Sequence, residues 1–277
     1  IIAGAGIGAI SGSSTASAAM MGRVSVPQMI RMGYDPKFAL GTASAGGTLA
    51  VLIPPSIAII LYGILTDTSV GKLLIAGIIP GALMTLAYII VILIWLKRNP
   101  ELAGRGEEYT LLEKLISLKS FWPILVIAFF VLGGMYTGAT TVTEAAGIGA
   151  LSTSLVAILF WKMSWKKIYE AASDAVQTTS MIIMIIIGAT IFGYFLTMSR
   201  LTQTFVDVVT NLDTSRWVVM AIIILLYLVL GFFMDQLAII TLTVPLTFPI
   251  ITALGFDPIW FGVVVIVLAE IGLITPP

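Results

Sequence analysis

Long apolar runs, separated by short polar stretches, extend along the chain. A helix needs about 20 apolar residues to cross the roughly 30 Å hydrocarbon core of a membrane. Runs close to that length predict membrane-crossing helices at 38–66, 71–96, 120–137, 143–162 and 175–199. The pattern therefore predicts an all-α integral membrane protein.

Two further apolar runs, 217–232 and 236–253, are marginal for a full crossing. At about 1.5 Å per residue the first would form a helix only about 24 Å long, and the second contains two prolines. We interpret them as the arms of a re-entrant helical hairpin with its tip near 231–235. The run 258–275 then begins another crossing.

The segment 164–174 differs from the apolar runs on either side of it. It combines Trp165 and Tyr169 with charged residues of both signs. Such a mixture favours the boundary between lipid and water. We therefore expect an interfacial helix there, ahead of the span 175–199.

Basic residues are distributed unequally between the two sides of the membrane when the spans are counted alternately. One side holds Arg23, Arg31, Lys37, Lys97, Arg98, Arg105, Lys114, Lys119, Lys162, Lys166 and Lys167, and the other holds Lys72, Arg200 and Arg216. Basic loops favour the cytoplasmic side. The first side, with the loop 97–119, is therefore predicted to be cytoplasmic, and 200–216 is predicted to be a polar connection on the opposite side.

Composition narrows the class of protein further. Of the 277 residues 59% are hydrophobic and 10% are charged, whereas a soluble domain carries about 25% charged residues. The chain contains no Cys and no His, which excludes disulfides, thiolate metal sites and histidine-based acid–base catalysis within it. Both ends lie in apolar sequence, so we expect further segments before and after the chain.

An internal repeat suggests the architecture. The sequence Gly-aromatic-Asp-Pro occurs at 33–36 and again at 255–258, and the same offset aligns Pro54-Pro55 with Pro276-Pro277. Because an odd number of predicted crossings lies between the two copies, they have opposite orientations. The offset also predicts a first hairpin with its tip at 11–14.

Inverted repeats with interrupted helices are typical of secondary transporters. A Pro-Pro pair within an apolar run removes two amide donors, so the carbonyls before it lose their helical partners. Lipid cannot satisfy those carbonyls, and a desolvated cation can. The segment 11–15 adds four hydroxyl groups, which are hard ligands of the same kind, although small residues there could equally serve helix packing.

Asp235 and Glu270 are the carboxylates placed deepest in apolar sequence. A charge at the centre of a membrane helix costs on the order of 3 kcal/mol, so both are candidates for function. The alternatives are a position nearer the membrane surface or a partner on another chain. An intramembrane enzyme that uses the two as a carboxylate pair would need a nucleophile or metal ligands, and none accompanies them, so we do not expect an enzyme.

Several motifs together resemble the large membrane subunit of tripartite ATP-independent periplasmic (TRAP) transporters. They are Ala9-Ile10-Ser11-Gly12-Ser13-Ser14-Thr15-Ala16, Ile53-Pro54-Pro55-Ser56-Ile57, Ala76-Gly77-Ile78-Ile79-Pro80-Gly81, Gly255-Phe256-Asp257-Pro258 and Gly272-Leu273-Ile274-Thr275-Pro276-Pro277. The resemblance runs through the whole chain. It implies an elevator-type inverted repeat with two re-entrant hairpins and two Pro-Pro-broken helices.

The resemblance also implies a division of the chain and a function. Residues 1–66 and 200–277 would form the moving transport part, and residues 67–199 the scaffold. The function would be sodium-coupled uptake of a small organic anion, such as a C4-dicarboxylate or sialic acid, across a bacterial or archaeal inner membrane. The alternative within transport is a stand-alone sodium/dicarboxylate symporter or an ion antiporter of related fold.

Partners and site residues follow from the same resemblance. The partners would be a small four-helix membrane subunit and a periplasmic substrate-binding protein, with lipid around the chain and no nucleic acid. Two or more Na⁺ ions would be the coupling ions. The first sodium site would use Ser11 and Ser13 or Ser14 with carbonyls near Ala50, Ile53 and Pro55; the second would use Gly231, Gly272 and Thr275; Ser13 and Asp235 would line the substrate pocket.

Overall fold

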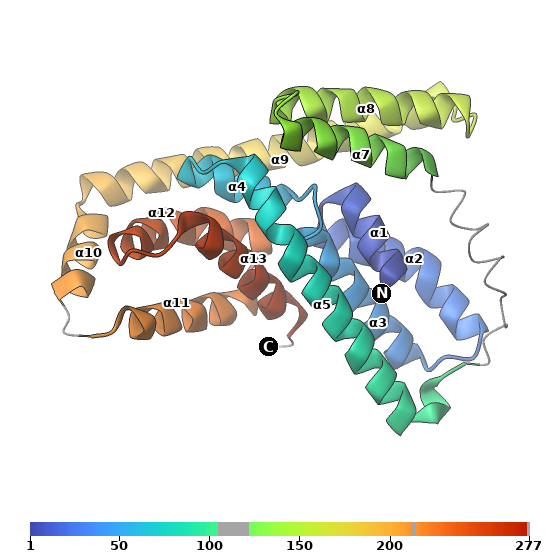
Figure 1. Ribbon diagram of the computed structural model, residues 1–277, viewed down its shortest axis with the longest axis horizontal. Coiled ribbons are helices and arrows are strands. Elements are labelled where there is room, and N and C mark those ends of the chain that lie inside the picture. The colour runs from blue at the N-terminus through green and yellow to red at the C-terminus, as the bar shows by residue number, and fades with distance from the viewer. Residues whose placement is uncertain (105–121, 212–213, 276–277) are drawn as a thin grey trace. The chain divides into compact units, whose positions relative to one another are not determined.

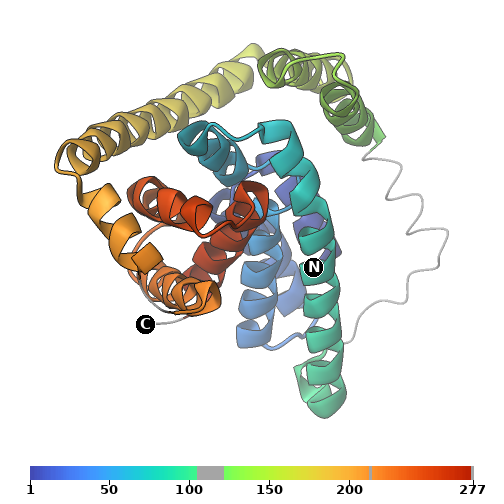
Figure 2. The same ribbon diagram turned by 60° about the vertical axis from the view of Figure 1, so that its left-hand side comes forward.

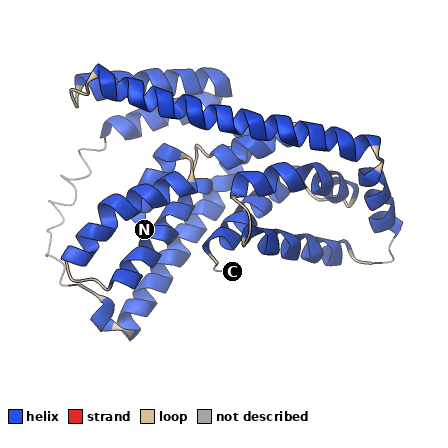
Figure 3. Cartoon of the chain, turned by 180° about the vertical axis from the view of Figure 1, so that it is seen from behind, coloured by secondary structure: helices blue, strands red, loops and turns tan. Residues whose placement is uncertain are grey.

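The computed structural model describes residues 1–104, 122–211 and 214–275. Every regular element in these residues is a helix, as Figure 3 shows, which confirms the predicted all-α class. The chain divides into two compact units, one formed by Ile1–Arg105 with Ile185–Pro277 and the other by Gly106–Met184.

The first unit begins with a helical hairpin made of α1 (Ile2–Ser11) and α2 (Ser14–Arg31). Its tip lies at Gly12, which has a φ of 62°, and at Ser13, whose side chain accepts a hydrogen bond from the Ala16 amide. The two helices lie side by side at the blue end of the chain in Figure 1. The turn between the two helices lies at the predicted place, and a hairpin that re-enters the membrane stays a prediction.

The apolar run 38–66 is interrupted as its prolines predict. It forms α3 (Pro36–Thr48), a short 3-10 turn η1 (Leu49–Val51) and α4 (Ile57–Thr66). The side chain of Ser56 caps α4 by accepting a hydrogen bond from the Ile59 amide. The chain is non-helical between η1 and α4 because the two prolines of that segment carry no amide hydrogen.

Two more elements of the first unit follow this interruption. The long helix α5 (Val70–Arg98) begins at the cap residue Ser69 and ends just before a 3-10 turn, η2 (Pro100–Leu102). Most of the predicted cytoplasmic loop 97–119 lies outside the described residues.

The C-terminal part of the first unit holds a second hairpin, α11 (Arg216–Gly231) and α12 (Gln236–Ala253), followed by α13 (Pro258–Ile274). Asp235 caps α12 and Asp257 caps α13. The predicted arms of this hairpin are confirmed as helices. Pro276 and Pro277, which were predicted to break the last helix, lie outside the described residues.

One predicted polar connection in this region is helical. The stretch 200–216, expected to be a polar connection, contains the helix α10 (Leu201–Asn211), which packs against α12. Thr202, Val206 and Val209 are its less exposed positions. Because they recur every three or four residues, they form one face of a helix, and packing on that face outweighs the polar composition.

The two halves of the first unit share one core. The ring of Tyr62 in α4 is fully buried, and its hydroxyl donates a hydrogen bond of 2.7 Å to the carbonyl of Pro258 at the start of α13. The same ring lies against Gly262, where a Cβ would be 2.5 Å from it, and its centroid is 6.3 Å from that of Phe248 in α12. Figure 2 shows α4 beside α12 and α13.

The second unit contains α7 (Trp122–Thr137), α8 (Val142–Leu159) and the first part of α9 (Trp165–Met198). Thr141 and Glu144 form a capping box at the start of α8. The separate interfacial helix expected at 164–174 is not found, because these residues are continuous with the following span in the single helix α9. The predicted position of 164–174 at the membrane surface stays a prediction.

Four helices of the described residues are long and apolar enough to cross a membrane, as judged by length and composition: α5, α8, α9 and α12. In the most apolar 18 residues, 50% are buried in α12 but only 11% in each of the other three. Apolar side chains exposed to that extent need lipid or another protein around them. The helices therefore support an integral membrane protein, with α12 inside its protein core.

Candidate functional site

The first hairpin approaches the interrupted helix through glycines spaced four residues apart on α1. A Cβ at Gly4 would lie 2.6 Å from the carbonyl oxygen of Gly46, and one at Gly8 would lie 2.6 Å from the Cα of Ala50. Only a residue without a side chain permits these backbone contacts. The small residues of this segment therefore serve close helix packing, and that packing also brings the hairpin tip to the interruption.

The tip is hydrogen-bonded to the interruption. The amide of Ile57 donates a hydrogen bond of 3.0 Å to the carbonyl of Gly12. A Cβ at Gly12 would lie 2.6 Å from the carbonyl oxygen of Pro55, so this oxygen faces the tip directly. The left-handed conformation of Gly12 and the missing side chain are both required for the contact.

Two carbonyls at the interruption lose their helical donors for different reasons. The donor to the Ala50 carbonyl in a continuous helix would be residue 54, which is a proline without an amide hydrogen. The donor to the Ile53 carbonyl would be the Ile57 amide, and that amide is engaged by Gly12 instead. Both carbonyls are therefore available to another partner.

The carbonyl of Pro55 is released as well. Its helical donor would be the amide of Ile59, which donates to the side chain of Ser56 instead, at 3.4 Å. All three carbonyls predicted for the first sodium site are thus freed close to the hairpin tip. Carbonyl oxygens are hard ligands that suit an alkali cation, so the residues fit the ion.

The hydroxyl groups of the tip are close together and partly used. The Ser11 hydroxyl is hydrogen-bonded to that of Ser17 and donates to the carbonyl of Ser13 at 3.1 Å. The Ser13 hydroxyl is hydrogen-bonded to that of Thr15 at 3.0 Å. Ser14 is buried and lies beside the carboxyl group of Glu270. The predicted hydroxyl ligands are therefore all present at the tip, but they face different neighbours.

The second hairpin meets α13 in the same manner as the first meets its interrupted helix. A Cβ at Gly231 would lie 2.5 Å from the Cα of Gly272, so the two backbones touch. The amides of 232–234 turn back to the carbonyls of Val229 and Leu230 and not to Gly231. The structure thus brings Gly231 and Gly272 together, as the second sodium site requires.

Thr275, the third residue predicted for the second site, lies at the end of α13. Its amide donates a hydrogen bond of 3.1 Å to the carbonyl of Gly272, and its hydroxyl donates one of 2.7 Å to Ile271. A cavity of about 610 Å³ opens at this place and is lined by the residues Gly231, Phe232, Phe233, Met234, Asp235, Leu273, Ile274 and Thr275. Thr275 and the hairpin tip therefore border one cavity.

The two residues predicted to contact substrate hold equivalent positions. Ser13 caps the returning arm α2, and Asp235 caps the returning arm α12, where its Oδ2 accepts a hydrogen bond of 3.1 Å from the Leu237 amide. Each therefore marks a helix N-terminus, where free amides and the helix dipole favour a negative charge. Asp235 is exposed to its cavity.

Glu270 belongs to this region, although the sequence alone predicts no binding site for it. It lies on α13 and is 1% exposed, and neither of its carboxyl oxygens has a hydrogen-bond partner in the described part of the chain. Close by, the buried side chain of Gln236 donates a hydrogen bond of 3.3 Å to the carbonyl of Ile266. An acid within an apolar run was the sequence signal for Glu270, and nothing comparable pointed to Gln236.

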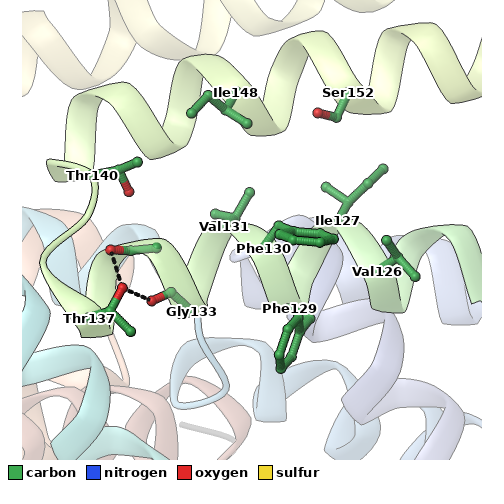
Figure 4. Close-up of a pocket in the computed structure, with 11 residues that line it drawn as sticks. Val126, Ile127, Phe129, Phe130, Val131, Gly133, Thr137, Thr140, Ile148 and Ser152 are labelled. Atoms are coloured by element: carbon green, nitrogen blue, oxygen red, sulfur yellow. Dashed lines mark hydrogen bonds between the residues drawn. The ribbon is translucent and has the colours of Figure 1, made fainter.

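A second cavity, of about 670 Å³, lies between α7 and α8 in the second unit (Figure 4). Its lining is mostly apolar, with Phe129 and Phe130 on α7, and includes no charged residue. The hydroxyl of Thr137 donates back to the carbonyls of Gly133 and Gly134 on its own helix. Such a surface suits lipid chains or apolar side chains and not an organic anion.

Comparison with known proteins gives consistent matches over the whole chain. The family described as "Tripartite ATP-independent periplasmic transporter, DctM component" matches residues 1–277. The C4-dicarboxylate TRAP transporter large permease protein DctM of Pseudomonas aeruginosa is 38% identical over 273 residues, which cover 97% of this chain and 63% of that protein.

Relatives named for other compounds match equally broadly. The sialic acid TRAP transporter large permease protein SiaM of Vibrio cholerae is 31% identical over 274 residues, covering 97% of this chain and 62% of the relative. The 2,3-diketo-L-gulonate TRAP transporter large permease protein YiaN of Escherichia coli is 30% identical over 269 residues, which cover 97% of this chain and 63% of that protein. The chain thus spans somewhat less than two thirds of these relatives.

Proposed function

Because the chain belongs to the DctM-component family of TRAP transporters, we propose that it forms the central part of a permease subunit that couples sodium entry to the uptake of a small organic anion. The main support is the interruption between α3 and α4. There the carbonyls of Ala50, Ile53 and Pro55 are released beside the first hairpin tip, which gives a hard, desolvated oxygen site.

Sodium is the coupling ion in this proposal. The first ion would be held by the released carbonyls with the hydroxyls of Ser11 and Ser13, since Ser14 faces Glu270 instead. The second would be held by Gly231, Gly272 and Thr275. Each sodium ion that enters down a membrane potential of about 100 mV contributes about 2.3 kcal/mol. Two ions would thus support steep accumulation of an anion.

The substrate would be a carboxylate. The N-termini of α2 and α12, capped by Ser13 and Asp235, provide amides and positive dipole ends for its charge. The names of the relatives cover a C4-dicarboxylate, sialic acid and 2,3-diketo-L-gulonate, all of which are organic acids. We propose a substrate of the same chemical class.

We propose that the two hairpins and their neighbouring helices move as one body in an elevator mechanism. In support, α4 of the first repeat packs against α12 and α13 of the second. The partners would be a small four-helix membrane subunit and a periplasmic binding protein. The protein would reside in the inner membrane, since its relatives are TRAP permeases and its helices are apolar.

An enzyme is not supported. The relatives are named as transporter permeases and not as enzymes.

Uptake by the complete transporter tests the proposal. The full-length large and small subunits would be reconstituted in liposomes, and labelled organic acids would be offered with the cognate binding protein. We expect uptake under an inward sodium gradient and only background uptake when potassium replaces sodium. Uptake that is independent of sodium would refute the coupling, and uptake that needs no binding protein would favour the stand-alone symporter.

A further inference from the structure

Glu270 is a buried acid for which the proposed sodium and substrate sites give no role. It is 1% exposed, and both of its carboxyl oxygens are without hydrogen-bond partners among the described residues. Buried polar groups are almost always hydrogen-bonded, because leaving one unsatisfied costs free energy. An ionised carboxylate there needs a compensating positive charge.

The groups around Glu270 come from both hairpin tips. Ser14 of the first tip is buried and lies beside the carboxyl, without a hydrogen bond of good geometry. The carboxylate of Asp235 at the second tip is close enough to repel the charge of Glu270.

Neither carboxyl oxygen of Glu270 is hydrogen-bonded to a Lys or Arg of the described residues. The described surroundings therefore offer oxygen atoms and negative charge but no hydrogen-bonded cation. That combination favours binding of a positive ion.

Glu270 lies apart from the second sodium site. Gly272, which contacts Gly231, is two residues further along α13, and residues two apart on a helix do not share a face. Gln236, by its hydrogen bond to Ile266, fixes the start of α12 to α13 one turn before Glu270. The carboxyl therefore lies near the start of α12, and Ser14 of the first tip lies beside it.

We propose that Glu270, with the hydroxyl of Ser14, binds one further monovalent cation, sodium, in a third site between the two hairpin tips. The inference rests on the proposed sodium coupling and extends it. One buried carboxylate with neutral oxygen ligands balances a single charge, whereas divalent ions usually gather several carboxylates. The ion would connect the tip of one repeat to a helix of the other. The positions of the two hairpins would then be coupled to each other.

Direct counting of bound sodium tests this site without measuring transport. The purified complete transporter would be equilibrated with radioactive ²²Na⁺, and the bound ions would be counted for the wild type, Glu270→Gln and Glu270→Met. Glu170→Gln, which alters an exposed carboxylate on α9, is the matched control. We expect Glu270→Met to bind one ion fewer than the wild type, Glu270→Gln to bind the third ion more weakly, and the control to be unchanged.

Thermal unfolding provides a second readout. In choline the Tm of Glu270→Met should equal or exceed that of the wild type, because an uncompensated buried charge has been removed. Adding sodium should raise the Tm of the wild type by more than that of the variant. The opposite order in choline, or unfolding of both variants, would show that Glu270 is structural and would overturn the proposal.

The two proposals fail in different ways. If the wild type and Glu270→Met bind the same number of sodium ions, the third site is refuted while the sodium-coupled function stands. If the wild type binds no sodium, the proposed function itself is refuted.

Discussion

Replacing Gly12 by alanine tests the contact between the first hairpin tip and the interrupted helix. Gly12 has a φ of 62°, and an added Cβ would lie 2.6 Å from the carbonyl oxygen of Pro55. Ordinary van der Waals contact begins at 3.4 Å, so tip and carbonyl must separate by about 0.8 Å. The hydrogen bond of 3.0 Å from the Ile57 amide to the Gly12 carbonyl would be disturbed as well.

The free-energy cost of Gly12→Ala is the sum of a backbone contribution and a hydrogen-bond contribution. A residue with a side chain in the left-handed region costs about 1–2 kcal/mol, and the loss of one backbone hydrogen bond costs about 1 kcal/mol. Together these amount to about 2–3 kcal/mol, or about 30- to 150-fold in an equilibrium constant. If sodium binds only when the Pro55 carbonyl meets the tip, its affinity should fall by that factor.

The assay is the sodium dependence of uptake in liposomes that contain the complete transporter. The matched control is Gly6→Ala, because Gly6 lies on the same helix, has no atom within 4 Å of an added Cβ and has no positive φ. We expect the sodium concentration for half-maximal uptake to rise steeply in Gly12→Ala and to stay unchanged in Gly6→Ala. Identical curves for the two variants would show that the tip contact does not form the sodium site.

Three other substitutions address the second hairpin and the shared core. Gly272→Ala places a Cβ 2.5 Å from the Cα of Gly231 and should abolish sodium-driven uptake, unlike Gly193→Ala, which has open space; equal uptake by both would contradict the second site. Tyr62→Phe should lower the free energy of unfolding by about 1 kcal/mol, measured as a reduced Tm, and an unchanged Tm would contradict the role of its hydroxyl. Asp235→Asn keeps the helix cap, so stability should stay normal while uptake falls about tenfold or more, since a hydrogen bond to the charged carboxylate contributes about 1.5–3 kcal/mol. Asp235→Ala should in addition lower the free energy of unfolding by about 1 kcal/mol. Normal uptake by Asp235→Asn would exclude Asp235 from the substrate pocket.

Local signals in the sequence were sufficient to predict the turn between α1 and α2 and the helix interruption between α3 and α4. Gly12, Ser13 and the prolines at 54 and 55 act on the backbone within a few residues of themselves, so their effect can be predicted without knowing the tertiary structure. The sequence pattern did not show that the polar connection at 200–216 is helical, or that 164–174 is continuous with the following span. Residues 165–187 contain no Gly or Pro, so α9 continues through its charged turns, and α10 is helical because one of its faces packs.

The sequence could not predict the hydrogen bonds that surround the proposed site, and its site residues stay a prediction. The sequence shows that prolines release carbonyls, but it does not show that the Ile57 amide bonds to Gly12, which also releases the carbonyl of Ile53. Nor does spacing place Ser14 beside Glu270, since 256 positions separate them in the sequence. Such contacts depend on the packing of distant helices, which periodicity does not encode.

The contacts between the two halves bear on how the transport part could move. The Tyr62 hydroxyl in α4 donates a hydrogen bond to the carbonyl of Pro258 in α13, and its ring fills the space over Gly262. Separating the halves would leave this hydroxyl unpaired in an apolar core, at a cost of about 1–3 kcal/mol, and would open a cavity as well. Sliding both hairpins together preserves every one of these contacts. Ion binding at either tip would therefore affect both hairpins and the helices packed between them. This coupling favours a single rigid-body movement over independent opening of the two hairpins.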